Sequence, residues 1–465
     1  MLGNVILRTD SYKVSHYRQY PPGTEKIYSY LEARVGGEYK DVVFFGLQYW
    51  LKRYFTGQVV TREKIEQAAR FFAHHFGNPD SFNRAGWEHI FEDHHGRLPV
   101  EIKAVPEGLV VPEGNVLLTI ENTCPKCFWL VNYLETLLVQ VWYGCTTATI
   151  SREMKRVIKQ ALKRSGTDTP ENLVFRLHDF GYRGVSSPES AAIGGAAHLV
   201  NFQGTDTLAA CELLMEYYGT AMPGFSIPAA EHSTITTWGE DGEVDAFRNM
   251  LEQYPTGLVA VVSDSWDIHR AATRHWGETL RQQVLARDGT LVIRPDSGDP
   301  EVILPDLLDA LGKNFPSPIN GKGFRVLPSK VLLIQGDGIK RSTLAGILEA
   351  VMRRGWSADC LSFGSGGGLL QDCNRDTERM AMKCSYAEVS GVGREVYKRP
   401  RTDPTKDSKR GRLMLVENER DSGPRFSTMR AGTPGFKDVL ATVFRDGELT
   451  REQSFDNIRA RAELE

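Results

Sequence analysis

Three consecutive segments decide the fold: GLVAVVSD at residues 257–264, DIHRAATRHWGETLRQQVL at 267–285 and TLVIRPDSG at 290–298. The first and third are short and rich in β-branched residues, which is typical of buried strands. The middle segment has the length and apolar spacing of an amphipathic helix. A strand, a helix and a second strand in this order predict two parallel strands joined by a crossover helix.

The same alternation extends to both sides of these segments. Further strand-like runs are LVFRLH at 173–178, VLLIQGDG at 331–338 and CLSFGSGGG at 360–368. Further helical runs are SAAIGGAAHLV at 190–200, PEVILPDLLDALGKNF at 300–315 and KRSTLAGILEAVMRRGW at 340–356. Because short β-rich runs alternate with amphipathic helices, we predict a barrel-like α/β domain in residues 146–384.

The segments that flank this domain have a different pattern. Residues 98–121 alternate apolar and polar side chains and are interrupted twice by Pro-Glu-Gly, which is typical of short antiparallel strands. Helices are predicted at 127–143 and 147–165, and the tail returns to strand-like runs, KCSYAEV, GREVYKRP and GRLMLVE. We therefore predict a second, sheet-rich α+β domain built from residues 1–145 and 385–465.

The composition excludes several classes of protein. Of 465 residues, 41% are hydrophobic and 25% are charged, as in ordinary globular proteins. The 56 basic residues nearly balance the 59 acidic ones, so we expect no nucleic-acid partner. No apolar run reaches the roughly 20 residues of a membrane span, and the N-terminus lacks the features of a signal peptide. With seven scattered cysteines, these features lead us to expect a cytoplasmic protein with reduced thiols and no membrane partner.

Polar residues follow five of the predicted strands: His178, Asp179 and Arg183; Asp264; Arg294, Asp296 and Ser297; Asp337; and Ser365. In a parallel barrel the carboxyl ends of the strands meet on one rim, where such enzymes place their chemistry. For a single aspartate, a solvated loop or a helix cap is the ordinary explanation. Five strand ends of this kind together predict a functional site.

The rim contains candidate groups for binding anions. Residues 364–368, GSGGG, could expose consecutive backbone N–H groups to a phosphate, although such a run also forms simple tight turns. Arg294 and Asp296 could hold a phosphate and a magnesium-bound water together. Asp264 and Asp337 would add carboxylate oxygens for the cation.

Two positions point to a flat organic ligand. Phe180 stands between a His-Asp pair and Tyr182-Arg183, so its ring could stack on a heteroaromatic ligand while Arg183 meets a charged group. Asp206 is either a helix cap or an acceptor for a ligand. Thr205 and Thr207 are also available as caps, so Asp206 is not required for capping.

His232, in EHSTIT, allows three interpretations: a buried structural histidine, a proton shuttle, or a nucleophile that accepts a phosphoryl group. A neutral imidazole is a competent phosphoryl acceptor, and the adjacent carboxylate of Glu231 could orient it. The residues alone leave all three interpretations open.

Other motifs carry weaker signals. Cys124 and Cys127 are close enough for a zinc or redox role, but two thiols in a turn are the ordinary alternative. We interpret the pairs His74-His75 and His94-His95 as surface residues. The basic loop at 399–412 is either solvated or in contact with an anionic ligand.

Several motifs resemble those of the nicotinamide phosphoribosyltransferases, a family of type II phosphoribosyltransferases. They are TDSYKVSHYRQYPPGT at 9–24, KAVPEG and VPEGNVL within 103–117, LHDFGYRGVSS at 177–187, NFQGTDT at 201–207, IPAAEHSTITTWG at 227–239, VVSDSWDI at 261–268, IRPDSGDP at 293–300, QGDG at 335–338 and FGSGGGLLQ at 363–371. The resemblance implies an irregular, TIM-like α/β barrel and a homodimer with shared active sites. It also implies transfer of the 5-phosphoribosyl group of 5-phosphoribosyl 1-pyrophosphate to nicotinamide, which gives nicotinamide mononucleotide and pyrophosphate for NAD salvage.

The same resemblance implies a role for each candidate residue. Phe180 and Tyr12 of the partner subunit would enclose nicotinamide, and Asp206 would accept a hydrogen bond from its carboxamide. The further substrate-binding residues would be Ser226, Arg183, Arg294, Asp337, Gly366, Gly367, Arg375, Lys383, Lys398 and Arg34 of the partner subunit. His232, Asp264 and Asp296 would be catalytic, with His232 transiently phosphorylated by ATP. Mg²⁺ would be held near Asp264 and Asp296 through water.

Two departures and two alternatives accompany the resemblance. Trp266 stands where the family has a tyrosine, and the segment after Arg34 is short. Nicotinate phosphoribosyltransferase is the nearest alternative. A site that binds the carboxylate of nicotinate needs a cation or a backbone N–H donor, and this sequence has Asp206 at that position. A homologue that has lost catalysis and acts as a binding partner is the other alternative, and the intact charged rim argues against it.

Overall fold

The chain divides into two units, each assembled from segments that are far apart in the sequence. The computed structural model describes residues 3–402, 407–418 and 424–464. Unit 1 comprises Met1–Thr149, Glu216–Thr220 and Cys373–Glu463. Unit 2 comprises Ile150–Met215, Ala221–Asp372 and Leu464–Glu465. Among the described residues, no helix is both long and apolar enough to cross a membrane.

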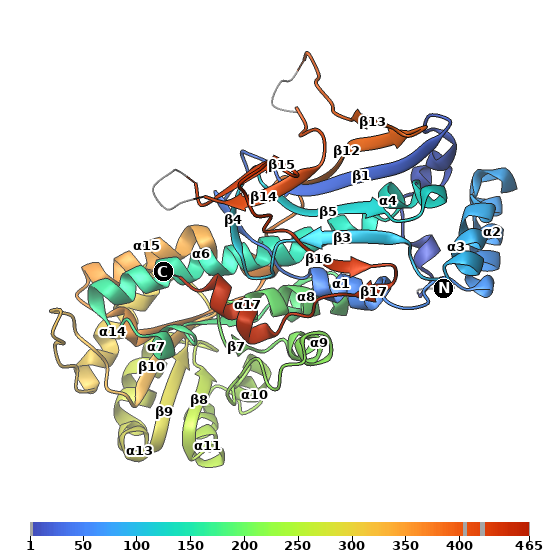
Figure 1. Ribbon diagram of the computed structural model, residues 1–465. Helices are drawn as coiled ribbons and strands as arrows, with labels where there is room; N and C mark the ends of the chain where they lie inside the picture. Colours follow the sequence, from blue (N-terminus) through green and yellow to red (C-terminus); the bar gives the residue numbers. More distant parts are fainter. Residues whose placement is uncertain (1–2, 403–406, 419–423, 465) are drawn as a thin grey trace. The chain divides into compact units, whose positions relative to one another are not determined.

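Unit 1 is built around a seven-stranded antiparallel sheet (Figure 1). The strands, in spatial order, are β13 (Val392–Glu395), β12 (Met380–Val389), β1 (Thr24–Ala33), β5 (Val116–Asn122), β3 (Val100–Ala104), β16 (Ala441–Arg445) and β17 (Glu448–Leu449). In β3 the side chains alternate between buried and half-buried, as the alternating sequence predicts. The interior strand β1 is buried along its last seven residues, because other elements cover both of its faces.

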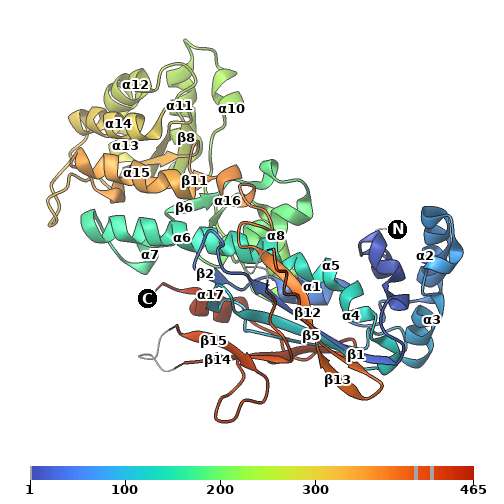
Figure 2. The same cartoon turned by 90° about the horizontal axis from the view of Figure 1, so that it is seen from above.

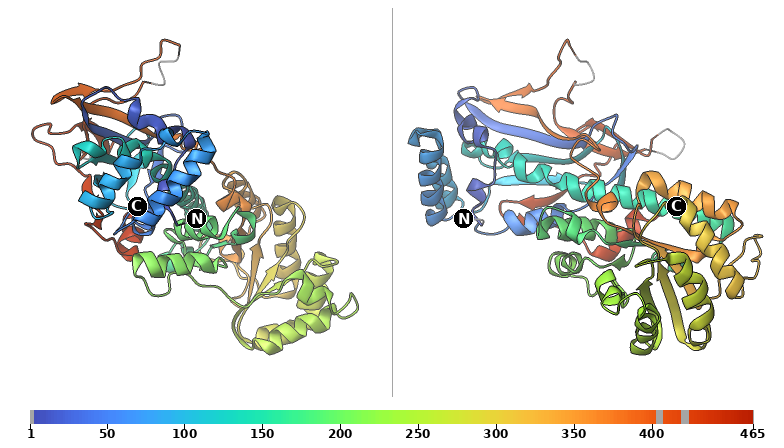
Figure 3. Two further views of the ribbon diagram at one scale, coloured as in Figure 1. Left: turned by 90° about the vertical axis from the view of Figure 1, so that its right-hand side faces the viewer. Right: turned by 180° about the vertical axis from the view of Figure 1, so that it is seen from behind.

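Smaller elements complete unit 1. Two strand pairs are β2 (Asp41–Val43) with β4 (Val110–Pro112), and β14 (Leu413–Glu417) with β15 (Phe426–Arg430). The helices are α1 (Leu47–Tyr54), α2 (Arg62–Phe76), α3 (Arg84–Asp93), α4 (Leu130–Tyr133), α5 (Glu135–Val139), α17 (Phe455–Ala462) and the short 3-10 turns η1 (Val5–Leu7), η2 (Ser11–Arg18), η3 (Pro79–Ser81) and η4 (Pro125–Cys127). Figure 3 shows α2 and α3 packed side by side.

Unit 2 contains a six-stranded parallel sheet. Its spatial order is β7 (Gly204–Thr205), β6 (Leu177–Asp179), β11 (Leu361–Ser365), β10 (Val331–Gln335), β9 (Asp288–Arg294) and β8 (Thr256–Val262). Every pairing within it is parallel, which confirms the prediction from the strand and helix alternation. The apolar runs of the central strands are buried, as in a sheet covered on both faces.

The segment at residues 225–230 bonds to both outer strands of this sheet. At β7, Phe225 donates from its N–H to the carbonyl of Gln203 and accepts from the N–H of Thr205. At β8, the N–H of Ala260 donates to the carbonyl of Pro228, and the N–H of Ala230 donates to the carbonyl of Ala260. Backbone hydrogen bonds therefore continue from β7 through this segment to β8.

Helices join the parallel strands (Figure 2). They are α7 (Pro170–Leu173), α8 (Pro188–Leu199), α9 (Leu208–Tyr218), α10 (His232–Thr236), α11 (Glu243–Gln253), α12 (Ile268–Arg270), η6 (Ala271–Thr279), α13 (Arg281–Ala286), α14 (Pro300–Asn314), α15 (Arg341–Arg353), α16 (Gly367–Leu370) and the short turns η5 (Tyr182–Gly184) and η7 (Ala358–Cys360). The long α6 (Val141–Ser165) contributes residues to both units.

Three details differ from the predicted elements. The helix expected at 127–143 is interrupted, because ψ angles of −10° at Leu134 and −13° at Gln140 break the α-helical hydrogen-bond ladder. The helix expected at 267–285 has a π-helical centre, η6, which buries Trp276 so that its Nε1 donates to Ser263 Oγ at 3.1 Å. Strand β12 runs across the predicted boundary at residue 384, and all of it pairs within unit 1.

Candidate functional site

The carboxyl ends of the parallel strands meet on one rim of unit 2, as the sequence predicts. The N–H of Phe180, after β6, donates to the carbonyl of Ser365 at the end of β11. The N–H of Ser263, after β8, donates to the carbonyl of Arg294 at the end of β9. Strand ends that are far apart in the sequence are therefore neighbours here.

Asp264 is the centre of a polar cluster on this rim. Its Oδ1 lies 3.0 Å from His232 Nε2, and its Oδ2 accepts from Ser297 Oγ at 2.6 Å and from the N–H of Asp296 at 3.1 Å. The Asp264 side chain is 5% exposed, whereas the His232 side chain is 48% exposed. A buried carboxylate thus fixes an imidazole that remains open to solvent.

The partner of His232 differs from the expected one. The carboxylate of Glu231 accepts a hydrogen bond from Ser233 Oγ, at the start of α10. The interpretation that Glu231 orients His232 is therefore wrong, because Asp264 occupies that role from the loop after β8, 32 residues further along. The exposed imidazole also excludes the interpretation of His232 as a buried structural residue.

Arg294 and Asp296 form an ion pair next to an aromatic ring. Arg294 donates from Nη2 and Nε to Asp296 Oδ1 at 2.8 and 3.1 Å, and its guanidinium lies 5.4 Å from the centroid of the Phe180 ring. A Cβ at Gly336 would lie 3.0 Å from Asp296 Oδ1 and 3.1 Å from Arg294 Nη2. The glycine of QGDG therefore makes room for this pair.

The ring of Phe180 lies against the backbone of β11. A Cβ at Gly364 would approach the Phe180 ring to 1.9 Å, so no residue larger than glycine fits there without displacing the ring. The half-buried Phe180 also packs against a buried cluster that contains Ala260, Val292 and Ile334. Gly364 is thus required by close packing rather than by phosphate binding.

Asp179 holds two backbone segments of the rim by hydrogen bonds. Its Oδ1 accepts from the N–H of Gly181 at 2.7 Å, and its own carbonyl accepts from the N–H of Asp206 at 2.9 Å. Burial raises the pKa of the Asp179 carboxyl to about 6, and the hydrogen bonds from its neighbours oppose this shift only in part.

We expect Asp179→Asn to stabilise the protein at neutral pH. A carboxyl whose folded pKa of about 6 exceeds its ordinary value of 3.8 favours folding fully below pH 3.8, and this contribution is lost as the pH rises through 6. The asparagine carries no charge, its Oδ1 can still accept from the N–H of Gly181, and its NH₂ can donate to the Thr205 hydroxyl that donated to the carboxylate. The gain should therefore reach about 3 kcal/mol above pH 7. Urea unfolding of both proteins at pH 5 and pH 7.5 measures it, and a gain that does not grow with pH would contradict the assignment.

Asp206 lies at the start of α9. Its carboxylate is exposed and accepts from Ser226 Oγ, while Thr205 Oγ1 accepts from the N–H of Thr207 at 2.9 Å. A threonine therefore serves the local turn, and Ser226, on the segment that joins β7 and β8, is the partner of Asp206. This arrangement favours Asp206 as an acceptor for a ligand.

The remaining candidates of unit 2 lie on exposed loops of the same rim. Arg183 is exposed in η5, and the side chain of Asp337 is exposed after β10. Gly366 and Gly367 form the turn from β11 into α16, where a Cβ on Gly184 would lie 4.0 Å from the Cα of Gly367. The loop that carries Arg183 and the glycine turn are therefore adjacent.

A cavity of about 920 Å³ extends from the amino-terminal halves of the parallel strands. Its wall is mainly apolar and includes Val292 and Ile334, the residues that contact Phe180. His178 also lines the cavity, and burial lowers the pKa of its imidazole. The base of the Phe180 ring thus lies next to a space that is wide enough for a small organic molecule.

The other candidate residues lie in unit 1. Tyr12, in η2, and Lys383, in β12, line one pocket of about 420 Å³. The pKa of Lys383 is lowered, chiefly by burial and then by the positive charges of Arg34, Lys398 and Arg375. The Glu135 carboxylate, which lines the same pocket, acts on the pKa of Lys383 in the opposite direction. Of the basic loop at 399–412, residues 403–406 lie outside the described residues.

Gly336, Gly364 and Asp179 support the site, although their sequence context does not indicate this role. The two glycines were visible in QGDG and FGSGGG, but a glycine near a strand end does not by itself reveal which side chain approaches it. Asp179 was visible as a strand-end aspartate, and only its burial distinguishes it from the exposed acids of the rim.

The chain is similar to known proteins along nearly its whole length. Residues 175–448 match the nicotinate phosphoribosyltransferase family, and residues 4–102 match the nicotinamide phosphoribosyltransferase N-terminal domain. A nicotinamide phosphoribosyltransferase of Xanthomonas campestris pv. campestris (strain 8004) is 50% identical over 469 residues, covering 99% of this chain and 98% of that protein. One of Acinetobacter baylyi (strain ATCC 33305 / BD413 / ADP1) is 35% identical, covering 98% and 97%.

Solved structures share the fold at low sequence identity. A nicotinate-nucleotide pyrophosphorylase from Pyrococcus furiosus has a TM-score of 0.62 at 15% identity and covers 99% of this chain and 95% of that one. A human nicotinic acid phosphoribosyltransferase has a TM-score of 0.57 at 16% identity and covers 98% and 92%. Both agree with the mixed α/β architecture described above.

Proposed function

The chain belongs to the nicotinamide phosphoribosyltransferase family, and we propose that it transfers the 5-phosphoribosyl group of 5-phosphoribosyl 1-pyrophosphate to nicotinamide. The products are nicotinamide mononucleotide, which feeds NAD synthesis, and pyrophosphate. The main support for this proposal is that the Arg294 guanidinium lies 5.4 Å from the centroid of the Phe180 ring. An aromatic platform and a phosphate-binding cation are thus combined on one rim.

The pyridine ring stacks on Phe180, and its carboxamide NH₂ donates to Asp206. Ser226 already donates to the Asp206 carboxylate, which holds this carboxylate in place. Nicotinate has no such donor and carries a negative charge that Asp206 repels. The lost hydrogen bond and the repulsion together favour nicotinamide over nicotinate.

The phosphoribosyl group lies against Arg183, Arg294 and the backbone N–H groups of Gly366 and Gly367, with Asp296 and Asp337 near its ribose. In the reaction the bond from C1 to the pyrophosphate oxygen breaks, both electrons leave with pyrophosphate, and the ring nitrogen of nicotinamide forms the new bond to C1. The ribosyl carbon gains oxocarbenium character on the way, as in glycoside cleavage. Fixed cations therefore stabilise the leaving group, and the stacked base is positioned for in-line attack on C1.

The carboxylates of the rim fit a magnesium ion. Asp264, Asp296 and Asp337 supply hard oxygen donors, which Mg²⁺ prefers. Because the oxygens of Asp264 already accept hydrogen bonds, Asp264 and Asp296 would hold the ion through water. When bound, the ion neutralises charge on the pyrophosphate.

We further propose that the enzyme is a homodimer. Unit 2 is an irregular, TIM-like α/β barrel, and the segment at 225–230 closes it. A homodimer completes each site with Tyr12 of the partner subunit on the second face of nicotinamide and Arg34 of the partner subunit near the phosphates. Arg375, Lys383 and Lys398 of unit 1 bind phosphate. The enzyme acts in the cytoplasm.

One assay tests the reaction and its substrate. Purified protein receives labelled 5-phosphoribosyl 1-pyrophosphate and Mg²⁺, with either nicotinamide or nicotinate, and mononucleotide formation is measured with and without ATP. We expect product from nicotinamide in clear preference to nicotinate. A preference for nicotinate would contradict the role of Asp206, and no product from either base would favour a homologue without catalysis.

ATP acts as a co-substrate that phosphorylates His232. The His232 Nε2–H donates to Asp264, which leaves the Nδ1 lone pair to attack the γ-phosphorus of ATP. The N–P bond forms while the bond from the γ-phosphorus to the bridging oxygen breaks, and ADP leaves with that electron pair. Asp264 stabilises the positive charge of the phosphorylated ring. Water later hydrolyses the N–P bond and returns phosphate.

We expect His232→Ala to abolish the stimulation by ATP and to leave slow, ATP-independent turnover, because the histidine touches neither ribose nor base. His269→Ala, which removes another exposed histidine of unit 2, should keep the stimulation. Rates with and without ATP, and acid-labile ³²P incorporation from γ-labelled ATP, measure the effect. Stimulation that persists in His232→Ala would remove the phosphohistidine from the mechanism.

A further inference from the structure

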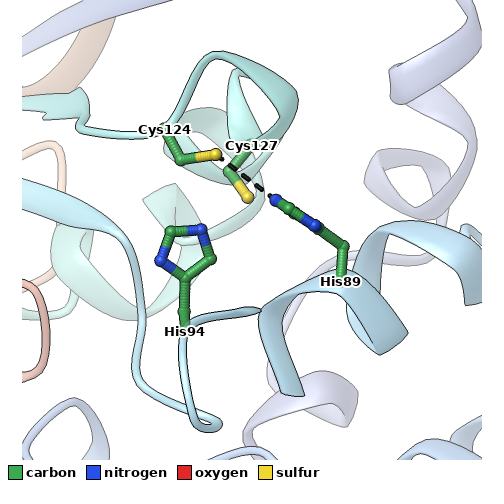
Figure 4. Close-up of side chains that lie close together, drawn as sticks. All are labelled: His89, His94, Cys124 and Cys127. Atoms are coloured by element: carbon green, nitrogen blue, oxygen red, sulfur yellow. Dashed lines mark hydrogen bonds between the residues drawn. The ribbon is translucent and has the colours of Figure 1, made fainter. Parts of the chain in front are cut away.

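Two histidines and two cysteines of unit 1 converge on one point. His89, His94, Cys124 and Cys127 each offer one ligand atom, and these atoms all lie within 4.8 Å of one another. Figure 4 shows the four side chains pointing toward a common centre, the histidines from α3 and the turn after it, the cysteines from the loop before α4. The expectation that His94 is a surface residue is thus wrong, whereas His74 and His75 are exposed as predicted.

The local backbone brings each pair together. Helix α3 ends at Asp93, and the left-handed conformation of His95 and Gly96 lets the N–H of Arg97 donate to the carbonyl of His94 at 3.0 Å. This turn points His94 back toward the helix end that carries His89. In η4, the N–H of Cys127 donates to the carbonyl of Cys124 at 2.9 Å, which places both thiols on one side of the turn.

Hydrogen bonding within the cluster is incomplete. His94 Nε2 is buried and has no hydrogen-bond partner, although a buried ring nitrogen ordinarily has one. His89 Nδ1 pairs with Asp93, so that its Nε2 faces Cys124 Sγ at 3.4 Å. A carboxylate that fixes one nitrogen while the other faces outward is the usual support of a metal-binding histidine. Cys127 is fully buried, with its thiol in the cluster.

The ligand set and its spacing fit zinc. Two thiolates and two imidazoles in a tetrahedral arrangement are typical of Zn²⁺, with Cys-x₂-Cys and His-x₄-His spacings in the usual range. Zinc bonds of about 2.0–2.3 Å separate neighbouring ligand atoms by roughly 3.5 Å. The largest present separation, 4.8 Å, therefore needs only a small movement of side chains to close around an ion.

We propose that His89, His94, Cys124 and Cys127 bind a structural Zn²⁺. Four protein ligands leave no open position for a substrate, so the ion joins the end of α3 to the turn between β5 and α4. The helices after this turn hold the segment that carries Tyr12. Tyr133 accepts through its carbonyl from Thr9 Oγ1 at 2.8 Å, and Glu135 pairs with Lys13 at 2.7 Å. The ion thereby stabilises the support of this segment.

Metal analysis of the full-length protein tests the proposal. The chain is expressed with zinc in the medium and purified without chelators, and its metal content is measured by plasma mass spectrometry. We expect one zinc per chain, and loss of this zinc in Cys124→Ser and in His94→Ala. Cys373→Ser and His74→Ala, which remove a thiol and an imidazole of unit 1 outside the cluster, should retain it.

Measurements on the unchanged chain keep the test independent of variant folding. Removal of zinc by a chelator should lower the Tm, and one equivalent of Zn²⁺ should restore it. Co²⁺ added instead should give the visible absorption of a tetrahedral thiolate site, with an intensity that Cys373→Ser keeps. A chain that holds no zinc after supply of the ion, a stoichiometric iron content, or zinc retained by Cys124→Ser would overturn the proposal.

Discussion

Arg294→Ala should lower kcat/KM for 5-phosphoribosyl 1-pyrophosphate by about a thousandfold, which corresponds to about 4 kcal/mol of transition-state stabilisation. The guanidinium is placed by its ion pair with Asp296 and lies beside the Phe180 ring. In the proposed mechanism it contacts the phosphoribosyl group where charge develops. Its loss also leaves the Asp296 carboxylate unpaired near an anionic substrate. Steady-state kinetics with each substrate varied in turn measure the effect.

Arg294→Lys provides the matched control. Lysine keeps the charge but lacks the planar fork that can meet phosphate and Asp296 together, so we expect an intermediate loss of about tenfold to a hundredfold. The Tm of both variants should stay close to that of the parent, because Arg294 is partly exposed at the rim. A change in kcat/KM of less than tenfold for Arg294→Ala would remove this residue from the substrate site.

Gly364→Ala should damage both stability and turnover. The added Cβ would lie 1.9 Å from the Phe180 ring, so the ring or strand β11 must move. Overpacking of this kind costs about 1–3 kcal/mol in the free energy of unfolding. Since the displaced ring is the proposed platform for nicotinamide, we expect kcat/KM for this base to fall by about a hundredfold.

The double variant Gly364→Ala/Phe180→Ala separates the two effects. Phe180→Ala alone costs stability through the lost packing of the ring, but in its background the further change Gly364→Ala should cost little, because the new methyl group then has space. Neither variant should recover activity. Gly321→Ala is a control for a glycine with open space around its Cβ position and no positive φ. Equal stability of Gly364→Ala and the parent would show that the predicted overlap between the methyl group and the ring is relieved without cost.

Local patterns predicted the parts of the fold and site that depend on neighbouring residues. The apolar runs of β8, β9 and β10 indicated buried parallel strands, and the polar residues after them gathered on one rim because parallel strands end on the same side. The pairing of Arg294 with Asp296 follows from a spacing of two residues. By contrast, the sequence did not predict β16, β17 and α17, because these elements are short, rich in charged residues and weakly patterned.

Long-range pairings could not be predicted in the same way. The adjacent Glu231 was the obvious partner for His232, yet the partner is Asp264, because the loop after β8 returns to the start of α10. The sequence did not indicate that His89 and His94 lie beside Cys124 and Cys127, because the strands β3, β4 and β5 separate the two pairs along the chain. Only the three-dimensional path of the chain brings such residues together.

The segment at 225–230 protects the protein from aggregation and limits where the chain can be altered. By bonding to β7 and β8, it covers both outer strands of the parallel sheet, where unpaired backbone groups would otherwise invite strands of other molecules to add. Insertions or a new chain terminus in this segment should therefore expose the unpaired edges of β7 and β8. We expect such changes to cause aggregation rather than a simple loss of catalysis. Tags, fusions and circular permutants are better placed elsewhere in the chain.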